Sequence, residues 1–334
     1  MPQVNQTVRQ QLGPFGIWLG GPEHFGDTAT AQRDALHRLD SLTTYGSIWT
    51  GEQVGGRDIY AHLGIWLAAT HRLAVGAGIA NLWARAPEDA QAAGATLAEA
   101  YPGRFINGIG IGHRIQADQV GADYRTPLAT MRTYLMRMHR EAQHSPLAAP
   151  PFPTVIAAVG PKMLDLAAES ADGAHPYFVP VAHTADARHR LGPDPLLIPE
   201  QSVLVDPTED TLAAYRQRMA IGTQISHYRA GLKRFGLSDD DLDHQSDKFF
   251  DAVAVAGTPE HVAQRIIDHL DAGADHVLVS AFGDLASVTN QLQRLAPALD
   301  AADARRAGAK VATSRPSRQS TTPPTATLPP VPTN

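Results

Sequence analysis

The sequence contains no cysteine among its 334 residues. Disulfide bonds, thiolate metal sites and cysteine nucleophiles are therefore excluded together. No stretch approaches the roughly 18 uninterrupted apolar residues that a membrane-spanning helix needs, so no membrane partner is expected. The N-terminal segment lacks the charged start and long apolar run of a signal peptide, which makes the cytoplasm the expected location.

Several familiar nucleotide and metal motifs are also missing. There is no glycine-rich GK[ST] loop, which disfavours nucleotide hydrolysis, and there is no HExxH motif. The 15 histidines form no ligand-spaced cluster with carboxylates, so no metal site is expected. The run GIGIGH at 108–113 is not a dinucleotide fingerprint, because histidine stands where the third glycine should fall.

Positive charge is scarce outside the C-terminal segment. The net charge of the chain is −6, but residues 301–334 hold five Lys or Arg against one Asp, which leaves −10 on residues 1–300. A nucleic-acid partner is therefore not expected. Residues 301–334 also contain six prolines, nine Ser or Thr and no aromatic residue, a composition that predicts a disordered tail after a domain at 1–300.

Short β-rich runs alternate with helical patterns along the domain. Strands are expected at 14–19, 46–50, 73–79, 104–112, 154–159, 174–179, 201–206 and 275–281. Helix-start signals lie between them at Thr28, Pro87, Pro161 and Thr258, and Gly273 should end the last of these helices. Because the runs are apolar enough to be buried on both faces, they predict a parallel sheet.

Eight strands alternating with helices predict an α/β fold of the (β/α)8 TIM-barrel type, with an open doubly wound sheet as the main competitor. The alternation is broken once, at about 207–257, where the pattern predicts a helical insertion before the last strand. In a barrel, binding and catalytic residues are found where strands end, because the following loops ring one face.

Glycines and histidines recur at these strand ends. Glycine there either allows a tight turn into a helix or lets a planar ring or phosphate approach the backbone, and glycine alone does not choose between these. Of the histidines at strand ends, His24, His113 and His175, we prefer His113 because it directly follows GIGIG and imidazole transfers protons near neutral pH. Other histidines fall on helices and are expected at the surface, namely His37, His71, His139, His144 and His269.

Several segments, taken in order, resemble the luciferase-like monooxygenases, and most of all the branch that uses the deazaflavin F420. They are THRLAVGAGIANLWARAPEDA (70–90), YPGRFINGIGIGH (101–113), FGIW (15–18), SIWTGE (47–52), AAVGPKMLDLAAESADGAHPYFV (157–179) and AGADHV (272–277). The resemblance covers about residues 14–299. It implies a TIM barrel with an insertion before the final strand, in agreement with the pattern of elements.

The resemblance also implies a cofactor cleft. Gly78 and Ile79, followed by Ala80, match the bulge behind the cofactor ring, where relatives often hold a non-proline cis peptide. The next part of the cleft is lined by Gly110, Ile111, Gly112 and His113, with Gln116 beyond them.

A second turn matches the cofactor phosphate site of the family. It comprises Gly160, Pro161, Lys162 and Met163. The N–H groups and dipole of a helix N-terminus favour an anion there, and Lys162 could add charge. A plain helix start would explain Pro161 equally well.

Glu52 and Gln53 stand where related enzymes place an acidic residue followed by histidine against the ring. In the sugar-phosphate dehydrogenase branch, strand two ends in Asp-His and strand four leads to a catalytic Glu. This sequence has Gln53 and His113 at those places. Glutamine cannot exchange protons, so that activity is not expected. His113 is the candidate acid or base, with Glu52 or Gln53 positioning the ring or the substrate.

These features favour an oxidoreductase that passes hydride between F420 and an unidentified small organic substrate. Two alternatives stay open: a monooxygenase of the same family using reduced FMN and oxygen, and a barrel that binds a cofactor without catalysis. The same bulge and phosphate turn serve both cofactors, so the sequence does not choose between them. Dimers are common in the family, which makes a homodimer one candidate assembly.

Overall fold

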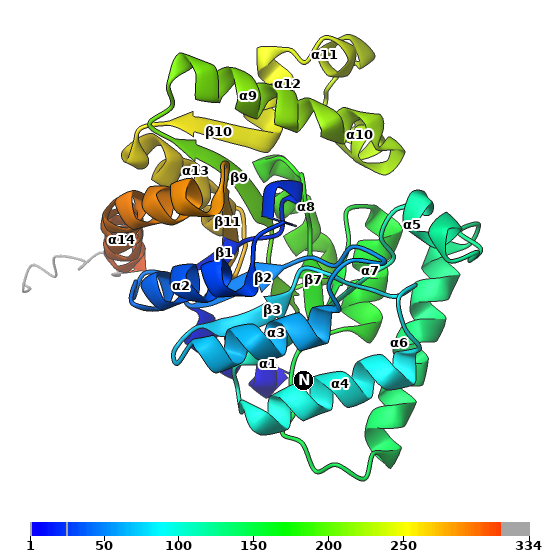
Figure 1. The fold of residues 1–334 in the computed structure, drawn as a ribbon. Helices are drawn as coiled ribbons and strands as arrows, with labels where there is room; N and C mark the ends of the chain where they lie inside the picture. The colour runs from blue at the N-terminus through cyan, green and yellow to red at the C-terminus, as the bar shows by residue number, and fades with distance from the viewer. Residues whose placement is uncertain (1, 25, 315–334) are drawn as a thin grey trace, which may run out of the picture.

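The computed structural model describes residues 2–24 and 26–314, and its centre is a parallel sheet surrounded by helices (Figure 1). The strands are β1 (Phe15–Trp18), β2 (Ser47–Thr50), β3 (Ala74–Ala77), β4 (Ala80–Asn81), β5 (Phe105–Gly110), β6 (Thr154–Ala157), β7 (Gly173–His175), β8 (Leu196–Leu197), β9 (Glu200–Val205), β10 (Ala254–Gly257) and β11 (Val277–Ala281). Every recorded pairing between these strands is parallel. Parallel pairing requires crossover connections, which the surrounding helices supply.

The helices begin at the predicted signals. Thr28 accepts a hydrogen bond from the first turn of α2, Thr258 does the same for α13, and Pro87 and Pro161 are the first residues of α4 and α7. The helical elements are α1 (Pro2–Leu12), η1 (Pro22–His24), α2 (Ala29–Asp40), α3 (Ile59–Ala69), α4 (Pro87–Ala100), α5 (Arg114–Gln119), α6 (Pro127–His144), α7 (Pro161–Ser170), α8 (Val181–Leu191), α9 (Glu209–Ala220), η2 (Ile221–Gln224), α10 (Ser226–Arg234), α11 (Asp239–Asp243), α12 (Asp247–Val253), α13 (Pro259–Asp271) and α14 (Leu285–Ser314). No helix of the described residues is both long enough and apolar enough to cross a membrane.

The strands follow one another in the order β10-β9-β11-β1-β2-β3-β5-β6-β7-β8, with β4 also paired to β5. From β1 to β8 this is chain order, without the reversal that marks a doubly wound sheet, so that alternative is wrong. The parallel α/β sheet is confirmed, and it curves at least as far as a half-barrel. β7 pairs with β8 and β9 pairs with β11, while only Ile198 and Pro199 separate β8 from β9.

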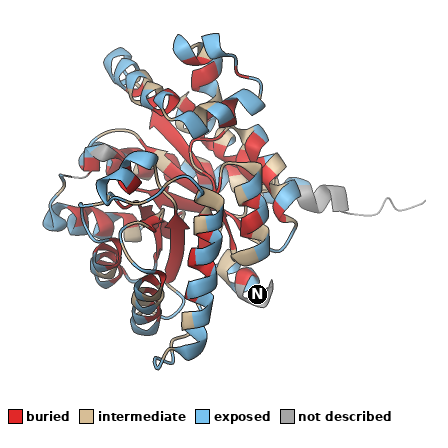
Figure 2. Cartoon of the chain, turned by 90° about the vertical axis from the view of Figure 1, so that its right-hand side faces the viewer, coloured by how far each residue is buried: buried red, intermediate tan, exposed pale blue. Residues whose placement is uncertain are grey.

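Burial explains why these apolar runs form strands. The strands are almost entirely buried, and the exposed faces belong to the helices around them (Figure 2). Side chains alternate across each strand, so Ile48 packs toward the helices and Trp49 packs inside the sheet with Ile106 and Leu278.

The interval between β9 and β10 contains four α-helices and one 3-10 helix, α9, η2, α10, α11 and α12, within the range predicted for an insertion. Their apolar side chains, including Tyr215, Leu232 and Phe249, form one cluster with Phe178 and Leu204, and Figure 1 shows these helices together at one end of the molecule. β10 extends the sheet beyond β9 and was not among the strands predicted from the sequence. Four residues with alanine and glycine gave too weak a strand pattern.

The predicted disordered tail began too early. α14 continues to Ser314, so residues 301–314 are helical. Ala302 is buried against the core, and Arg306 donates a 2.7 Å hydrogen bond from Nε to Asp271. The helical spacing of Leu295, Leu299 and Ala302 carries the buried face past residue 300. The rest of the predicted tail, 315–334, lies outside the described residues.

His269, expected at the surface, is buried together with His276. The ring of His269 contacts the Thr184 hydroxyl at 2.8 Å and the Gln201 side-chain oxygen at 2.9 Å. His276 contacts Ser47 at 2.7 Å and the Gly13 carbonyl at 2.8 Å. Burial lowers the pKa of His269 to about 3 and that of His276 to about 4, so both are neutral at pH 7.

We expect these two histidines to make the fold sensitive to acid. The unfolded pKa of histidine is about 6.5, so the unfolded chain binds more protons as pH falls below that value. The contribution of each buried histidine to the free energy of unfolding is fully present above this pH. It is lost as the pH falls toward the folded pKa, by about 2 kcal/mol per group at pH 5. Urea unfolding at about pH 7.5 and about pH 5 measures the loss, which His276→Gln should reduce by about that amount. His244→Gln, at an exposed histidine, should leave the loss unchanged, and equal losses in both variants would contradict the prediction.

Candidate active site

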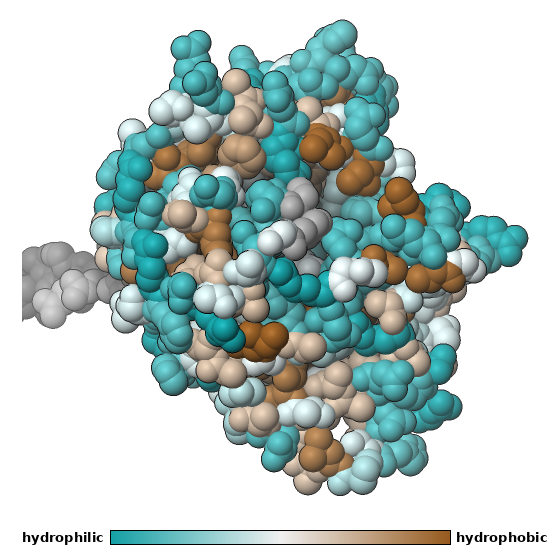
Figure 3. Space-filling view, viewed as in Figure 1, coloured by the Kyte–Doolittle hydropathy of each residue, from teal (hydrophilic) through white to brown (hydrophobic). Residues whose placement is uncertain are grey.

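A cavity of about 770 Å³ lies at the carboxyl ends of the strands. It is lined by the segments that follow β1, β2, β3, β5, β6 and β7, and by η2 and α10. Its volume is within the range of roughly 300–1,000 Å³ found for small-molecule sites. The outer face shown in Figure 3 is mainly hydrophilic, with apolar side chains in small separate groups. That face offers no argument for a homodimer, which stays a prediction.

The structure brings most of the predicted site residues together at this cavity. Those that line it are Glu52, Gln53, Gly78, Ile79, Ile111, Gly112, His113, Gln116, Gly160, Pro161, Lys162 and Met163. Ala80 and Gly110 do not line it, because they pair within the sheet behind the bulge. A side chain at Gly110 would collide with Ile79, since an added Cβ would lie 2.4 Å from its Cγ1.

The Gly78-Ile79 bulge is a backbone surface whose two carbonyl groups both accept hydrogen bonds. Its peptide bond is cis, as the resemblance implied. The Gly78 carbonyl accepts a 3.3 Å hydrogen bond from the indole of Trp18, and the Ile79 carbonyl accepts a 3.0 Å bond from the Glu52 amide. A Cβ at Gly78 would lie 3.0 Å from Trp18 Nε1 and 3.1 Å from His175 Nε2. Glycine therefore keeps this part of the cavity floor free of side chains.

The carboxylate of Glu52 is already hydrogen-bonded to other groups of the protein. It accepts hydrogen bonds from the amides of Ile59 at 3.3 Å and Asn81 at 2.7 Å, and it pairs with both terminal nitrogens of Arg85. The Glu52 side chain is 3% exposed. Glu52 therefore contributes to the cavity through its backbone amide, which supports the bulge. The neighbouring side chain, Gln53, is exposed.

His113 lies where β5 leads into α5. Its amide donates a 2.9 Å hydrogen bond to the Gln116 side chain, which gives Gln116 a capping role. Its Nδ1 is buried and has no hydrogen-bond partner in the described part of the chain. The ring stacks on His227 at 5.2 Å between centroids and meets Tyr228 edge-on at 5.8 Å. Burial lowers the pKa of His113, which favours the neutral imidazole.

His175 is a site residue that the sequence analysis named at a strand end but did not select. It is 1% exposed, and its Nδ1 lies 2.7 Å from the Ile198 carbonyl. A carbonyl only accepts hydrogen bonds, so Nδ1 carries the proton. Burial lowers the pKa of His175 to about 4. Its Nε2 is therefore an acceptor, and within the described residues it has no donor.

The Gly160–Met163 turn is a weaker anion site by itself than its sequence suggested. Pro161 has no N–H, and the Met163 amide is bonded to the Gly160 carbonyl at 3.0 Å. Arg234, from the end of α10, adds a second cation to Lys162. Its guanidinium donates a 3.1 Å hydrogen bond to the Val159 carbonyl, and Nη1 lies 4.0 Å from where a Gly160 Cβ would be. We call Gly160, Lys162 and Arg234 the anion cradle.

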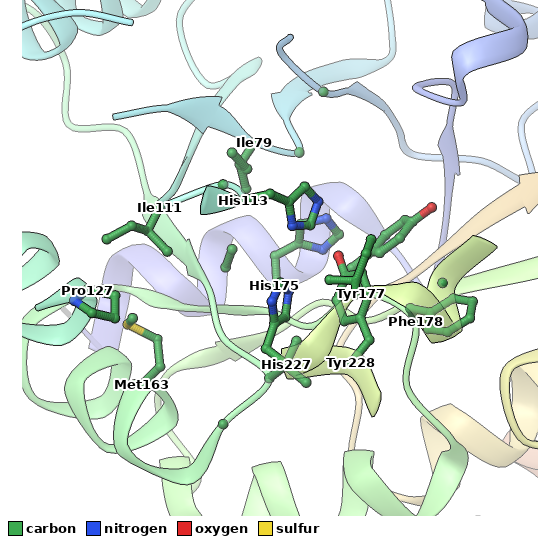
Figure 4. Close-up of a pocket in the computed structure, with 18 of the residues that line it drawn as sticks. Ile79, Ile111, His113, Pro127, Met163, His175, Tyr177, Phe178, His227 and Tyr228 are labelled. Atoms are coloured by element: carbon green, nitrogen blue, oxygen red, sulfur yellow. The ribbon is translucent and has the colours of Figure 1, made fainter. Parts of the chain in front are cut away.

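Aromatic rings form the opposite part of the lining. Tyr177 lies 5.2 Å from Trp18, and Tyr228 lies 5.4 Å from Phe178, measured between ring centroids. Figure 4 shows Tyr177, Phe178 and Tyr228 on one side of the cavity and Met163 on the other. Several lining residues were not predicted from the sequence, and they come from the helices between β9 and β10: Arg218, His227, Tyr228 and Arg234. No group of three or more His, Asp or Glu within 2–24 and 26–314 is arranged to hold a metal.

The fold and the cavity together define an α/β protein whose ligand site lies at the carboxyl ends of parallel strands. Within that class, the family described as luciferase-like monooxygenase matches residues 16–276, and the chain belongs to this family. It is therefore an enzyme, related to oxidoreductases.

Individual relatives agree with this assignment. The chain is 26% identical to a 5,10-methylenetetrahydromethanopterin reductase of Archaeoglobus fulgidus over 286 residues, 70% of this chain and 84% of the relative. It is similar to an F420-dependent secondary alcohol dehydrogenase in complex with an F420-acetone adduct, with a TM-score of 0.68, 15% identity and coverage of 86% and 98%. It is also similar to the FMN complex of the oxygenating constituent of 3,6-diketocamphane monooxygenase from Pseudomonas putida, with a TM-score of 0.61, 15% identity and coverage of 85% and 96%. At these identities the solved structures show a shared fold.

Proposed function

We propose that the protein is an F420-dependent oxidoreductase that transfers a hydride between the deazaflavin and a small organic substrate. The observation that carries the proposal is the joint lining of one cavity by the Gly78-Ile79 bulge, the His175 acceptor and the anion cradle. The names of the relatives, a methylenetetrahydromethanopterin reductase and an F420-dependent alcohol dehydrogenase, support the same activity.

The residues fit such a cofactor. A flat ring can lie on the bulge, because Gly78 leaves no side chain above the backbone. The unpartnered Nε2 of His175 accepts a hydrogen bond, and the heterocyclic edge of a deazaflavin carries an N–H donor. Lys162 and Arg234 would bind the phosphate of its side chain. The ring and the phosphate would thus be held at separate points of the cavity.

When bound, the cofactor supplies the carbon that gives or takes the hydride. The aromatic wall of Trp18, Tyr177 and Phe178 would keep water away from that carbon. Neutral His113, which lines the same cavity, would accept a proton from a substrate hydroxyl at its unpartnered Nδ1 during oxidation and return it during reduction. Orientation by the bulge and proton transfer by His113 are the contributions of the protein.

The same proposal includes a complete (β/α)8 barrel. In it, Ile198 and Pro199 join β8 and β9 into one interrupted strand between β7 and β11. The helices at 209–253 are then an insertion before the final strand, β11, and they supply η2 and α10 to the cavity. A truncation series that removes β11 and α14 should abolish cooperative unfolding if the sheet is closed.

A reduced-FMN monooxygenase is the second candidate, because a neighbour in fold binds FMN. Titration of the purified full chain with F420 and, separately, with FMN distinguishes the two. We expect F420 to bind at least tenfold more tightly, a difference of about 1.4 kcal/mol. A reversed ratio supports the monooxygenase, and binding of neither contradicts both. Hydride transfer to a panel of ketones and alcohols then separates an enzyme from a binding protein.

Lys162→Glu should weaken F420 binding by about 1–3 kcal/mol at low salt, because the charge reversal places an anion in the anion cradle. The dissociation constant would rise by a factor between about 5 and 150. Arg305→Glu makes the same charge change on the exposed surface of α14 and should have no effect. Unchanged affinity of Lys162→Glu at low salt would remove Lys162 from the site.

A further inference from the structure

We propose that Arg218 binds a carboxylate group of the substrate, which makes the substrate class a small organic acid with an apolar or aromatic body. This inference rests on the proposed function for the reaction, and it adds the identity of the group that the cavity recognises. Four observations support it: the position of Arg218, its incomplete pairing, its aromatic surroundings and its separation from the anion cradle.

Arg218 comes from α9 of the insertion and lines the cavity. Its side chain is 23% exposed, and its Nε is buried without a hydrogen-bond partner in the described residues. The recorded ion pair with Glu23 places Nε 3.5 Å from the carboxylate oxygen, beyond a good hydrogen bond. A guanidinium has five N–H donors in a planar fork, which suits a carboxylate approaching from the cavity.

The surroundings of Arg218 suit an organic acid rather than a bare inorganic ion. Tyr177, Phe178 and Tyr228 line the same cavity, and Tyr177 is near enough to Arg218 for the guanidinium to influence its hydroxyl. Ile221 on η2 also lines the cavity and is largely exposed. Burial raises the pKa of both tyrosines, so their hydroxyls stay neutral donors. Apolar walls with few charged groups hold the body of a ligand while the guanidinium orients its anion.

Glu200 is a buried acid on β9. Its charge would affect the hydroxyls of Tyr177 and Tyr228. Its Oε1 has no hydrogen-bond partner among the described residues, and burial raises the pKa of Glu200 to about 8. Burial thus favours the neutral form of Glu200, which weakens its competition for the charge of Arg218. Glu23, whose carboxylate lies 3.5 Å from Arg218 Nε, is the recorded competitor for the guanidinium; it is partly exposed and follows β1.

Arg218 and the anion cradle serve different parts of the cavity. Arg218 contacts Glu23, which follows β1, whereas the cradle follows β6, and β2, β3 and β5 lie between those strands in the sheet. The cofactor phosphate and the substrate carboxylate therefore have separate cations. Because Glu52 is paired with Arg85, the lining also holds an excess of positive charge.

The test uses phenylacetate and its neutral isostere phenylacetamide as probes of the full-length protein without cofactor. Calorimetry or quenching of tryptophan fluorescence at low salt measures both affinities. We expect phenylacetate to bind at least about tenfold more tightly than phenylacetamide. Arg218→Gln should abolish this preference while leaving phenylacetamide binding unchanged. Glu23→Gln should tighten phenylacetate binding, because it removes the competing carboxylate.

Arg216→Gln is the matched control, since Arg216 lies on the same helix but pairs with Asp247 and covers Phe250 outside the cavity. It should bind both probes like the wild type. Absence of phenylacetate binding at millimolar concentration, or a preference that survives Arg218→Gln, would overturn the proposal. A preference lost in Lys162→Glu instead would place the carboxylate in the anion cradle and would also overturn it.

The cofactor titration separates this inference from the proposed function. Arg218→Gln should bind F420 like the wild type, because its cation is not part of the anion cradle. If the wild type binds neither F420 nor FMN yet shows the Arg218-dependent preference for phenylacetate, the proposed function fails and the carboxylate site stands. If F420 binds but the preference is absent, the carboxylate site fails alone.

Discussion

Replacing Arg85 by methionine is expected to lower the free energy of unfolding by about 3–5 kcal/mol, because it leaves a buried carboxylate without its cation. The side chains of Glu52 and Arg85 are 3% and 11% exposed, so water cannot replace the lost partner. Arg85 also donates to Asp58 at 2.9 Å and lies over the ring of Tyr60, contacts that methionine reproduces only in part. Urea unfolding at pH 7 with linear extrapolation measures the loss.

Two further variants test whether the buried charge is the cause. Adding Glu52→Gln to Arg85→Met removes the charge and should recover part of the lost stability. Arg137→Met breaks an ion pair with Glu88 whose arginine side chain is 44% exposed, and it should change the free energy of unfolding far less than Arg85→Met does, because water screens an exposed pair. If Arg85→Met is as mild as Arg137→Met, the pair does not stabilise the fold as described.

The Glu52–Arg85 pair also connects stability to the site. Glu52 holds Asn81 through its carboxylate and Ile79 through its amide, so the pair fixes both sides of the bulge. Loss of Arg85 should therefore loosen the surface on which we place the cofactor ring. The resemblance assigned Glu52 to the ring or the substrate. In the structure its carboxylate is bonded within the protein, and its amide supports the backbone on which we place the ring.

The order of elements could be predicted because it depends on local chemistry. Thr28 and Thr258 cap helices through bonds to amides a few residues ahead, and apolar runs buried on both faces leave few folds open. The errors arose where tertiary contacts decide. β10 is a strand because β9 lies beside it, and α14 stays helical past Asp300 because Arg306 reaches Asp271.

The candidate site divides in the same way. Gly78 and Lys162 could be named from the family resemblance, and His113 from its place after a strand. All three lie in segments that follow strands, and strand ends meet on one face. Arg218 and Tyr228 could not be named, because the helices between β9 and β10 reach the cavity through packing on distant segments such as Phe178. No spacing in the sequence reports that contact. The buried partner of Glu52 was missed for the same reason, since Arg85 lies 33 residues away along the chain.

The strongest effect on activity is expected from His113→Asn. Asparagine can keep a hydrogen bond but cannot transfer a proton, and general acid–base catalysis is worth roughly 10²–10⁴ in rate. We expect kcat to fall by about that factor while F420 affinity, measured by titration, stays within a few-fold of the wild type. His37→Asn, at an exposed position on α2, should leave both quantities unchanged.

The pH profile separates a catalytic imidazole from one that only fills space. Burial lowers the pKa of His113, so the wild type should keep its neutral base below the ordinary histidine pKa of about 6.5 and lose kcat/KM only at more acidic pH. The stacked ring of His227 can also titrate in acid, since burial lowers its pKa to about 4. His113→Asn should therefore remove the fall in kcat/KM at acidic pH. His227→Asn should keep that fall, because His113 still titrates. Turnover of His113→Asn within a few-fold of the wild type, with the fall in kcat/KM intact, would make His113 a structural residue of the cavity wall.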